Sequence, residues 1–296
     1  MSKNAKGALL TTMGGMCWGL SGSMGQYLFT VQGMDARWLT PIRLFLAGVI
    51  LFFYRLFQNR ASLFDILKHK RSLLLLACYG LLGVAFCQLT YFMTIQYSNA
   101  GVGTIMQDLS PIMILVMSCI LGMRRPKWIE ILSLILALVG VYLIVTHGDP
   151  KTLSVSPRAL ILGVLSAVGV TVYNMIAPSL TKDYPVTVLQ TWSFLAGGIF
   201  VGILGRGYEI HYVPNAMGIF GILFVIAVGN LLAFTSYIKG VQYIGPGKGI
   251  LYGFSEPVTA ALIATVLFHN PFGVFDFLGF LCIFLMLLLI SISQEN

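Results

Sequence analysis

Charged residues are scarce in this chain: they make up 9% of its 296 residues, whereas hydrophobic residues make up 57%. Soluble domains carry about 25% charged and about 45–50% apolar residues, so this composition excludes a water-soluble globular enzyme. It also excludes an intrinsically disordered chain, because such chains are poor in apolar residues. Since a transmembrane helix needs about 20 apolar residues, ten spans would use most of the chain.

Residues that bind metals are also few. The four histidines lie in loops or at the ends of apolar segments, and none of the five cysteines has CxxC spacing. We therefore expect no metal site, no cofactor and no disulfide. The net charge of +8 could suggest nucleic acid. In so apolar a chain, however, basic residues serve to set membrane topology, and we expect no nucleic-acid partner.

The chain does contain ten apolar segments, separated by breaks rich in charge, glycine and proline. They predict an all-α polytopic membrane protein with ten transmembrane helices. The joins between the third and fourth segments and between the ninth and tenth are short, so those neighbours form antiparallel hairpins. The approximate limits of the segments are 7–31, 38–57, 72–97, 100–122, 129–146, 158–180, 186–205, 215–239, 248–268 and 272–293.

Lysine and arginine are unevenly distributed between the two sides of the predicted bundle. With the N-terminus inside, the cytoplasmic set is Lys3, Lys6, Arg55, Arg60, Lys68, Lys70, Arg71, Arg124, Arg125, Lys127 and Lys182. The opposite set is only Arg37, Lys151, Arg158 and Arg206. Because basic residues concentrate on the cytoplasmic side, we expect both termini in the cytoplasm of a plasma or inner membrane protein.

The chain carries an internal repeat with a shift of 146 residues. Under this shift Tyr91, Gln96, Tyr97, Gly101, Gly103 and Pro111 coincide with Tyr237, Gln242, Tyr243, Gly247, Gly249 and Pro257. The halves are residues 1–146 and 147–296, with five spans each. Because five is odd, the second half enters the membrane from the opposite side, and such inverted repeats are typical of secondary transporters. The two prolines predict kinks in the fourth and ninth spans.

Short motifs follow one another in a recognisable order. They are Cys17-Trp18-Gly19, Ile42-Arg43-Leu44-Phe45, Gly140-Val141-Tyr142-Leu143-Ile144 and Glu256-Pro257-Val258-Thr259-Ala260-Ala261-Leu262. With the five-plus-five pattern, they resemble the EamA-type branch of the drug/metabolite transporter superfamily over essentially the whole chain. The resemblance implies transport of metabolites or amino acids, more often as export. The family's Gly-Glu pair is replaced by Gly122-Met123-Arg124 and Phe268-His269-Asn270, so a role of that carboxylate does not transfer.

Once the loops and the flanks of the predicted spans are set aside, three charged residues remain inside the spans: Arg43, Asp108 and Glu256. A charge in the membrane core is costly, so it usually faces a cavity or a partner. Asp108 and Glu256 flank the two prolines and are candidates to bind a proton or a cationic substrate group; the alternative is a permanent ion pair or a bond to backbone. Arg43 can snorkel to the interface or hold a substrate carboxylate as a planar fork. We favour the structural role and keep Arg43 as a substrate-binding candidate.

Polar and aromatic residues near the middle of the spans complete the candidate substrate-binding set. Tryptophan and tyrosine can stack on a ring or hold a cation, and a buried amide needs hydrogen-bond partners. These residues are Trp18, Ser21, Gln88, Tyr91, Asn174, Asn230, Tyr237 and Tyr252.

These features predict a secondary transporter of small organic metabolites, such as amino acids or related zwitterionic or cationic compounds. It would work by alternating access of the two halves, with proton coupling through Asp108 or Glu256. Arg43 with Asp108 would suit a zwitterion, whereas the two carboxylates alone would suit a cation.

Two alternatives remain open, a uniporter or channel-like facilitator and an integral membrane enzyme. A channel would show repeated pore residues. An enzyme would show clustered His, Asp or Ser in an interfacial loop, and the loops lack them, so we expect no enzyme. The expected partners are a small-molecule substrate and the lipid bilayer. The sequence leaves a monomer and a homodimer open.

Overall fold

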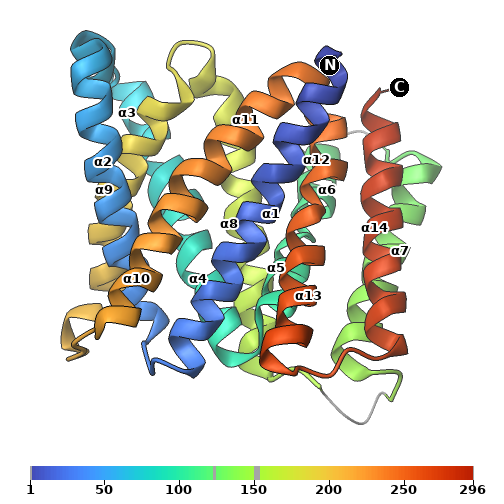
Figure 1. Cartoon of the computed structure of the whole chain (residues 1–296). Helices are drawn as coiled ribbons and strands as arrows, with labels where there is room; N and C mark the ends of the chain where they lie inside the picture. The colour runs from blue at the N-terminus through green and yellow to red at the C-terminus, as the bar shows by residue number, and fades with distance from the viewer. Residues whose placement is uncertain (1, 123–124, 150–153, 296) are drawn as a thin grey trace.

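The structure, a computed structural model, describes residues 2–122, 125–149 and 154–295, and the regular elements within these ranges are all helices (Figure 1). Met123 and Arg124, at the departure from the family motif, and Lys151, in the charge count, lie outside the described residues.

The all-helical, ten-segment architecture predicted from the sequence is confirmed. Several segments are built from consecutive shorter helices, and α2 bends at Asn59, whose φ of −159° and ψ of 88° are not helical. The segments are α1 (Lys3–Thr30), α2 (Ala36–Asp65) continued by η1 (Ile66–Lys68), α3 (Lys70–Ala77) with η2 (Cys78–Ala85) and α4 (Phe86–Tyr97), α5 (Ala100–Gln107) with α6 (Ser110–Leu121), α7 (Trp128–Thr146), α8 (Pro157–Thr181), α9 (Val186–Leu204), α10 (Ala216–Phe224) with η4 (Val225–Leu232) and α11 (Ala233–Ile244), α12 (Pro246–Gly253) with α13 (Ser255–Phe268), and α14 (Val274–Glu295); η3 (Gly207–Glu209) is a short turn after α9.

Helix α1 differs from the other segments in its hydropathy. Within the described residues, nine helical segments are long and apolar enough to cross a membrane, and α1 is not among them although it has 28 residues. It packs against α11, α13 and α4, so much of its surface faces protein rather than lipid. Its many glycines and hydroxyl residues suit close helix packing, and they lower its hydropathy.

The fourth and ninth segments are interrupted at equivalent places. The helix breaks after Gln107 in one and at Phe254 in the other, in each case three residues or so before the proline that was expected to kink it. Proline has no N–H, so Pro111 and Pro257 leave the carbonyls of Gln107 and Gly253 without their helical donors. The predicted kinks are confirmed as two broken helices.

A second symmetric feature had no counterpart in the sequence prediction. Segments η2 and η4 are both π-helices of eight residues, and they begin at Cys78 and Val225, which the repeat makes near-equivalent. Such π-segments are frequent at functional sites because they widen the helix and redirect its side chains. Both lie in the middle of the bundle.

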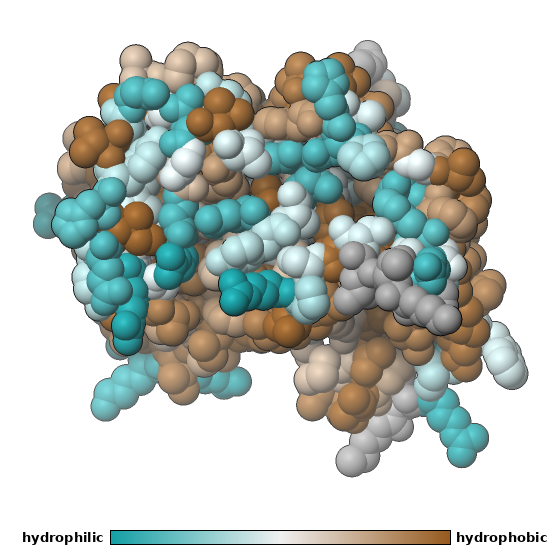
Figure 2. Space-filling view, turned by 90° about the horizontal axis from the view of Figure 1, so that it is seen from below, coloured by the Kyte–Doolittle hydropathy of each residue, from teal (hydrophilic) through white to brown (hydrophobic). Residues whose placement is uncertain are grey.

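The two halves interleave rather than stand apart. Helices α2 and α9 pack together at one edge of the bundle, and α7 and α14 at the other, with α1, α4, α8 and α13 between them (Figure 1). Both chain ends lie at the same end of the bundle, as an even number of spans requires. Polar side chains gather on the opposite end, and apolar side chains surround them (Figure 2).

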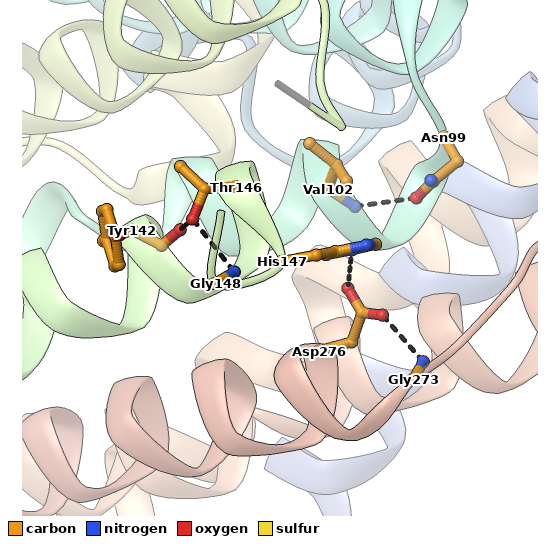
Figure 3. A network of polar contacts seen from close by, with 8 residues as sticks. All are labelled: Asn99, Val102, Tyr142, Thr146, His147, Gly148, Gly273 and Asp276. Atoms are coloured by element: carbon orange, nitrogen blue, oxygen red, sulfur yellow. Dashed lines mark hydrogen bonds and ion pairs between the residues drawn. The ribbon is translucent and has the colours of Figure 1, made fainter. Parts of the chain in front are cut away.

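A polar brace joins α7 to α14 at this opposite end (Figure 3). His147, in a left-handed conformation after α7, places Nε2 3.0 Å from Asp276 Oδ1. The other carboxylate oxygen of Asp276 accepts a hydrogen bond of 2.8 Å from the Gly273 N–H. The brace links the last helix of one repeat to the last helix of the other.

Candidate functional site

Two adjoining cavities lie in the middle of the bundle. The first has a volume of about 90 Å³ and is lined by Trp18, Ser21, Arg43, Tyr79, Val84, Cys87, Gln88, Tyr91, Phe92, Gln107, Tyr173, Gln190, Phe194, Gly229, Phe234 and Glu256. The second has a volume of about 200 Å³ and is lined by Trp18, Gln107, Asp108, Ser110, Pro111, Ile114, Val170, Tyr173, Asn174, Tyr237, Ile250, Gly253, Glu256 and Leu287. Four residues line both, so the cavities share a wall: Trp18, Gln107, Tyr173 and Glu256.

Arg43 gives the first cavity its positive charge. Its side chain is only 3% exposed, so it does not reach an interface as a snorkelling arginine would. Its guanidinium lies 3.9 Å from the centre of the Phe92 ring and donates a hydrogen bond to Gln88 Oε1. Its Nε is buried without a hydrogen-bond partner, and no carboxylate forms an ion pair with Arg43 among the described residues. A buried cation in this state favours an anionic group that enters the cavity.

Glu256 brings the opposite charge to the wall between the cavities. It lies in the first turn of α13, where the positive end of the helix dipole stabilises a carboxylate. Tyr91 Oη, from α4 in the other half, donates to Glu256 Oε1 over 3.4 Å. This contact connects the two repeats directly at the wall between the cavities.

Asp108 lies in the second cavity, at the break between α5 and α6. Its Oδ2 is buried without a hydrogen-bond partner. The sequence suggested Arg43 with Asp108 as the pair for a zwitterion; Arg43 lines only the first cavity and Asp108 only the second, whereas Glu256 lines both.

Most of the other predicted residues line one of the cavities. Trp18 packs against Phe234 and Tyr237, with ring centres 5.0 and 4.9 Å apart. Ser21, Gln88 and Tyr91 line the first cavity, and Asn174 and Tyr237 line the second.

Two predicted residues, Asn230 and Tyr252, line neither cavity. Asn230, in η4, is 2% exposed, and both polar atoms of its side chain lack a partner. Tyr252, in α12, is 41% exposed.

Several lining residues were not predicted. Gln107 accepts a hydrogen bond of 2.9 Å from Ser166 Oγ. Its position immediately before Asp108 in the sequence could have identified it as a candidate lining residue. Tyr79, in the π-helix η2, together with Tyr173 and Gln190, had no such signal. They add ring faces and an amide to a cavity that holds two opposite charges.

The second cavity lies nearer to the chain termini than the first. Asn174 on α8, Tyr237 on α11 and Gly253 on α12 all lie closer to that end of their helices than the lining residues of the first cavity. The opposite end is closed by fully buried side chains, among them Leu28, Leu39 and Ile95.

Two glutamines reinforce this closed end. Gln26 Oε1 accepts a hydrogen bond of 2.8 Å from the Ala100 N–H, and Gln96 Oε1 accepts one of 2.9 Å from the Ala36 N–H. Burial acts to raise the pKa of the nearby Asp35 carboxyl, but the hydrogen bonds and charge of Arg37 outweigh it and hold the pKa below its usual value. Asp35 therefore remains ionised, and continues to cap the N-terminus of α2, as the pH falls into the acidic range.

Comparison with known proteins agrees with this architecture. A Salmonella typhimurium protein described as "Uncharacterized inner membrane transporter YicL" is 32% identical over 100% of this chain and 98% of its own length. A Bacillus subtilis protein described as "Uncharacterized transporter YyaM" is 22% identical over 79% of this chain and 77% of its own.

A solved structure titled "Crystal structure of protein" superposes with a TM-score of 0.67 at 14% identity, covering 99% of both chains, which shows a shared fold. The EamA-like transporter family matches the chain twice, over residues 5–146 and 157–292. These two matches correspond to the two repeats, and the chain is a multi-pass membrane transporter that belongs to the EamA-like transporter family.

Proposed function

We propose that the protein is a secondary active transporter that exports small zwitterionic metabolites, amino acids or close relatives, by proton-coupled alternating access. The observation that carries the proposal is the first cavity, where Arg43 and Glu256 bring opposite charges without forming an ion pair among the described contacts. A guanidinium binds a carboxylate as a planar fork, and a carboxylate binds an ammonium group. A zwitterion satisfies both.

The cavity volumes favour a small substrate. Sites for drug-sized ligands measure about 300–1,000 Å³, whereas these cavities measure about 90 and 200 Å³. Rings of Trp18, Tyr173 and Phe194 supply apolar faces for the rest of the molecule. The size and lining support a metabolite rather than a bulky drug.

The coupling group in this proposal is Glu256. A proton and a substrate ammonium group compete for one carboxylate, so binding of substrate and binding of a proton exclude each other, and substrate release accompanies proton binding. The Tyr91–Glu256 contact spans the two halves, and a change at Glu256 therefore acts on the interface that alternating access must rearrange.

The topology is part of the same proposal. With both termini in the cytoplasm, as the lysine and arginine count favours, the second cavity lies on the cytoplasmic side of the first. Substrate enters from that side while the closed end faces outward.

Transport in proteoliposomes tests the proposal, with a mixture of labelled amino acids and an imposed pH gradient. We expect Arg43→Lys to weaken zwitterion binding by about tenfold or more, because lysine cannot form the fork. Glu256→Gln removes the response to the pH gradient, because the amide cannot take up a proton. The matched controls are Arg60→Lys and Glu209→Gln, both at exposed positions. Unchanged transport in Arg43→Lys and Glu256→Gln would refute the proposal.

A further inference from the structure

The charged groups of the two cavities outnumber those that a neutral amino acid needs. Among the described lining residues the charged side chains are Arg43, Glu256 and Asp108. A zwitterion matches Arg43 and Glu256 and leaves Asp108, in the second cavity, without a matching charge. A buried carboxylate without a cation is costly, and its unpartnered Oδ2 marks an unfilled interaction.

The backbone around Asp108 also favours a cation. Asp108 caps the C-terminus of α5, and Gly253, the last residue of α12, lines the same cavity. Helix C-termini carry a partial negative charge of about half an elementary charge. In addition, Pro111 and Pro257 deprive the carbonyls of Gln107 and Gly253 of their helical donors. The second cavity thus combines two carboxylates, Asp108 and Glu256, with two carbonyls that lack helical donors; the starts of α6 and α13, at Ser110 and Ser255, adjoin the same breaks.

The first cavity is too small to hold more than the head of such a substrate. Its volume is about 90 Å³, less than half that of the second cavity, about 200 Å³. If the head group of the substrate occupies the first cavity, the substrate's side chain extends past Glu256 into the second cavity, because Glu256 and Trp18 line both cavities. Apolar residues there, such as Ile114 and Val170, suit the methylene groups of a flexible chain.

We propose that Asp108 forms a separate subsite for a positively charged side chain, and that the preferred substrates are α-amino acids with a cationic side chain. This inference rests on the proposed function. The substrate carboxylate binds Arg43, its α-ammonium group binds Glu256, and the terminal ammonium group binds Asp108. Three charges of the protein then meet three charges of the substrate.

The test compares L-lysine with L-norleucine, which has the same backbone and chain but lacks the terminal amine. The full-length protein is purified, reconstituted and assayed by exchange of labelled lysine against each competitor. In the wild type, norleucine should compete at least about tenfold more weakly than lysine. Asp108→Asn should weaken lysine binding by about tenfold or more and leave norleucine binding within about twofold.

Two further variants separate a lost subsite from a damaged fold. Asp183→Asn makes the same chemical change at an exposed position, and both affinities should stay unchanged. Asp108→Glu keeps the carboxylate and should keep the preference for lysine.

Three outcomes would contradict the inference in different ways. If the wild type binds both amino acids equally and Asp108→Asn changes nothing, the subsite does not exist and the proposed function stands. If Asp108→Asn lowers both amino acids alike and removes the response to the pH gradient, Asp108 is a proton-binding group. If neither amino acid is bound by the wild type, the proposed function fails and the subsite with it.

Discussion

At the scale of single residues, Arg43 shows how a cation is kept available inside a membrane. The ring of Phe92 and the amide of Gln88 hold its guanidinium, and neither contact neutralises the charge. A cation over an aromatic face gains about 0.5–2 kcal/mol. The ring therefore stabilises and orients the guanidinium while leaving its charge for a substrate carboxylate.

Replacing Phe92 with leucine should weaken substrate binding without abolishing it. The variant keeps an apolar side chain but loses the ring face, so we expect affinity for a zwitterion to fall by about 2- to 30-fold. Equilibrium binding of labelled substrate to purified protein measures the change. Phe29→Leu is the control, because the Phe29 ring packs against the Phe92 ring, with ring centres 5.8 Å apart, and Phe29 lines neither cavity. An equal loss in both variants would indicate a packing effect only.

Which residues line the cavities was only partly predictable. Arg43, Asp108 and Glu256 could be identified because a charge inside an apolar run is costly. Tyr173 and Gln190 could not, because the lipid-facing and protein-facing sides of a membrane helix are both apolar and leave no amphipathic signal. For the same reason Asn230 and Tyr252 were chosen by residue type, and they line neither cavity.

At the scale of helices, the sequence predicted the spans and both breaks, but not the π-helices. Apolar runs and the prolines are local signals, so they survive in a single sequence. Neither Cys78–Ala85 nor Val225–Leu232 contains a residue type that favours the wider turn of a π-helix over that of an α-helix. These segments depend on contacts with other helices, η2 with α8 and α9 and η4 with α1. The boundary between the halves after Thr146 stays a prediction.

The contact of α1 with α13 positions Glu256 and gives a prediction for Gly19. A Cβ atom at Gly19 would lie 2.6 Å from the Glu256 carbonyl oxygen and 3.1 Å from the Ala260 nitrogen. Backbone atoms cannot yield as a flexible side chain can, so Gly19→Ala should displace the first turn of α13. We expect transport to fall by about tenfold or more and stability by about 1–3 kcal/mol.

The matched control for Gly19 contacts the same helix at a place with more room. At Gly101 an added Cβ would lie 3.3 Å from Asn99 Oδ1, a side-chain atom that a small shift can move, and 3.4 Å from the Ala261 Cα, an ordinary packing distance. Gly101→Ala should therefore transport normally. Thermal unfolding and uptake, measured at equal amounts of reconstituted protein, compare the two variants. Normal transport by Gly19→Ala would show that the position of Glu256 does not depend on this contact.

At the scale of the whole molecule, alternating access requires the closed end to open. The barrier there is a layer of buried apolar side chains together with the two glutamine contacts to helix starts. Gln26 comes from α1, and the Ala100 N–H that it binds begins α5, the first half of a broken segment. Opening of this end thus separates α1 from the helix that carries Asp108 at its other terminus.

Gln26→Ala should shift the molecule toward the conformation that is open at this end. The variant leaves the Ala100 N–H buried without a partner, which destabilises the closed conformation by about 1–3 kcal/mol. This corresponds to a change of about 5- to 150-fold in the equilibrium between the closed and the open conformation. Cys87 reports the opening, because its thiol lines the first cavity and is buried. A membrane-impermeant thiol reagent, added to the side opposite the termini, should label Cys87 at least about fivefold faster in Gln26→Ala. Labelling that persists after Cys87→Ser arises from another cysteine, and an unchanged rate at Cys87 would show that Gln26 does not hold this end closed.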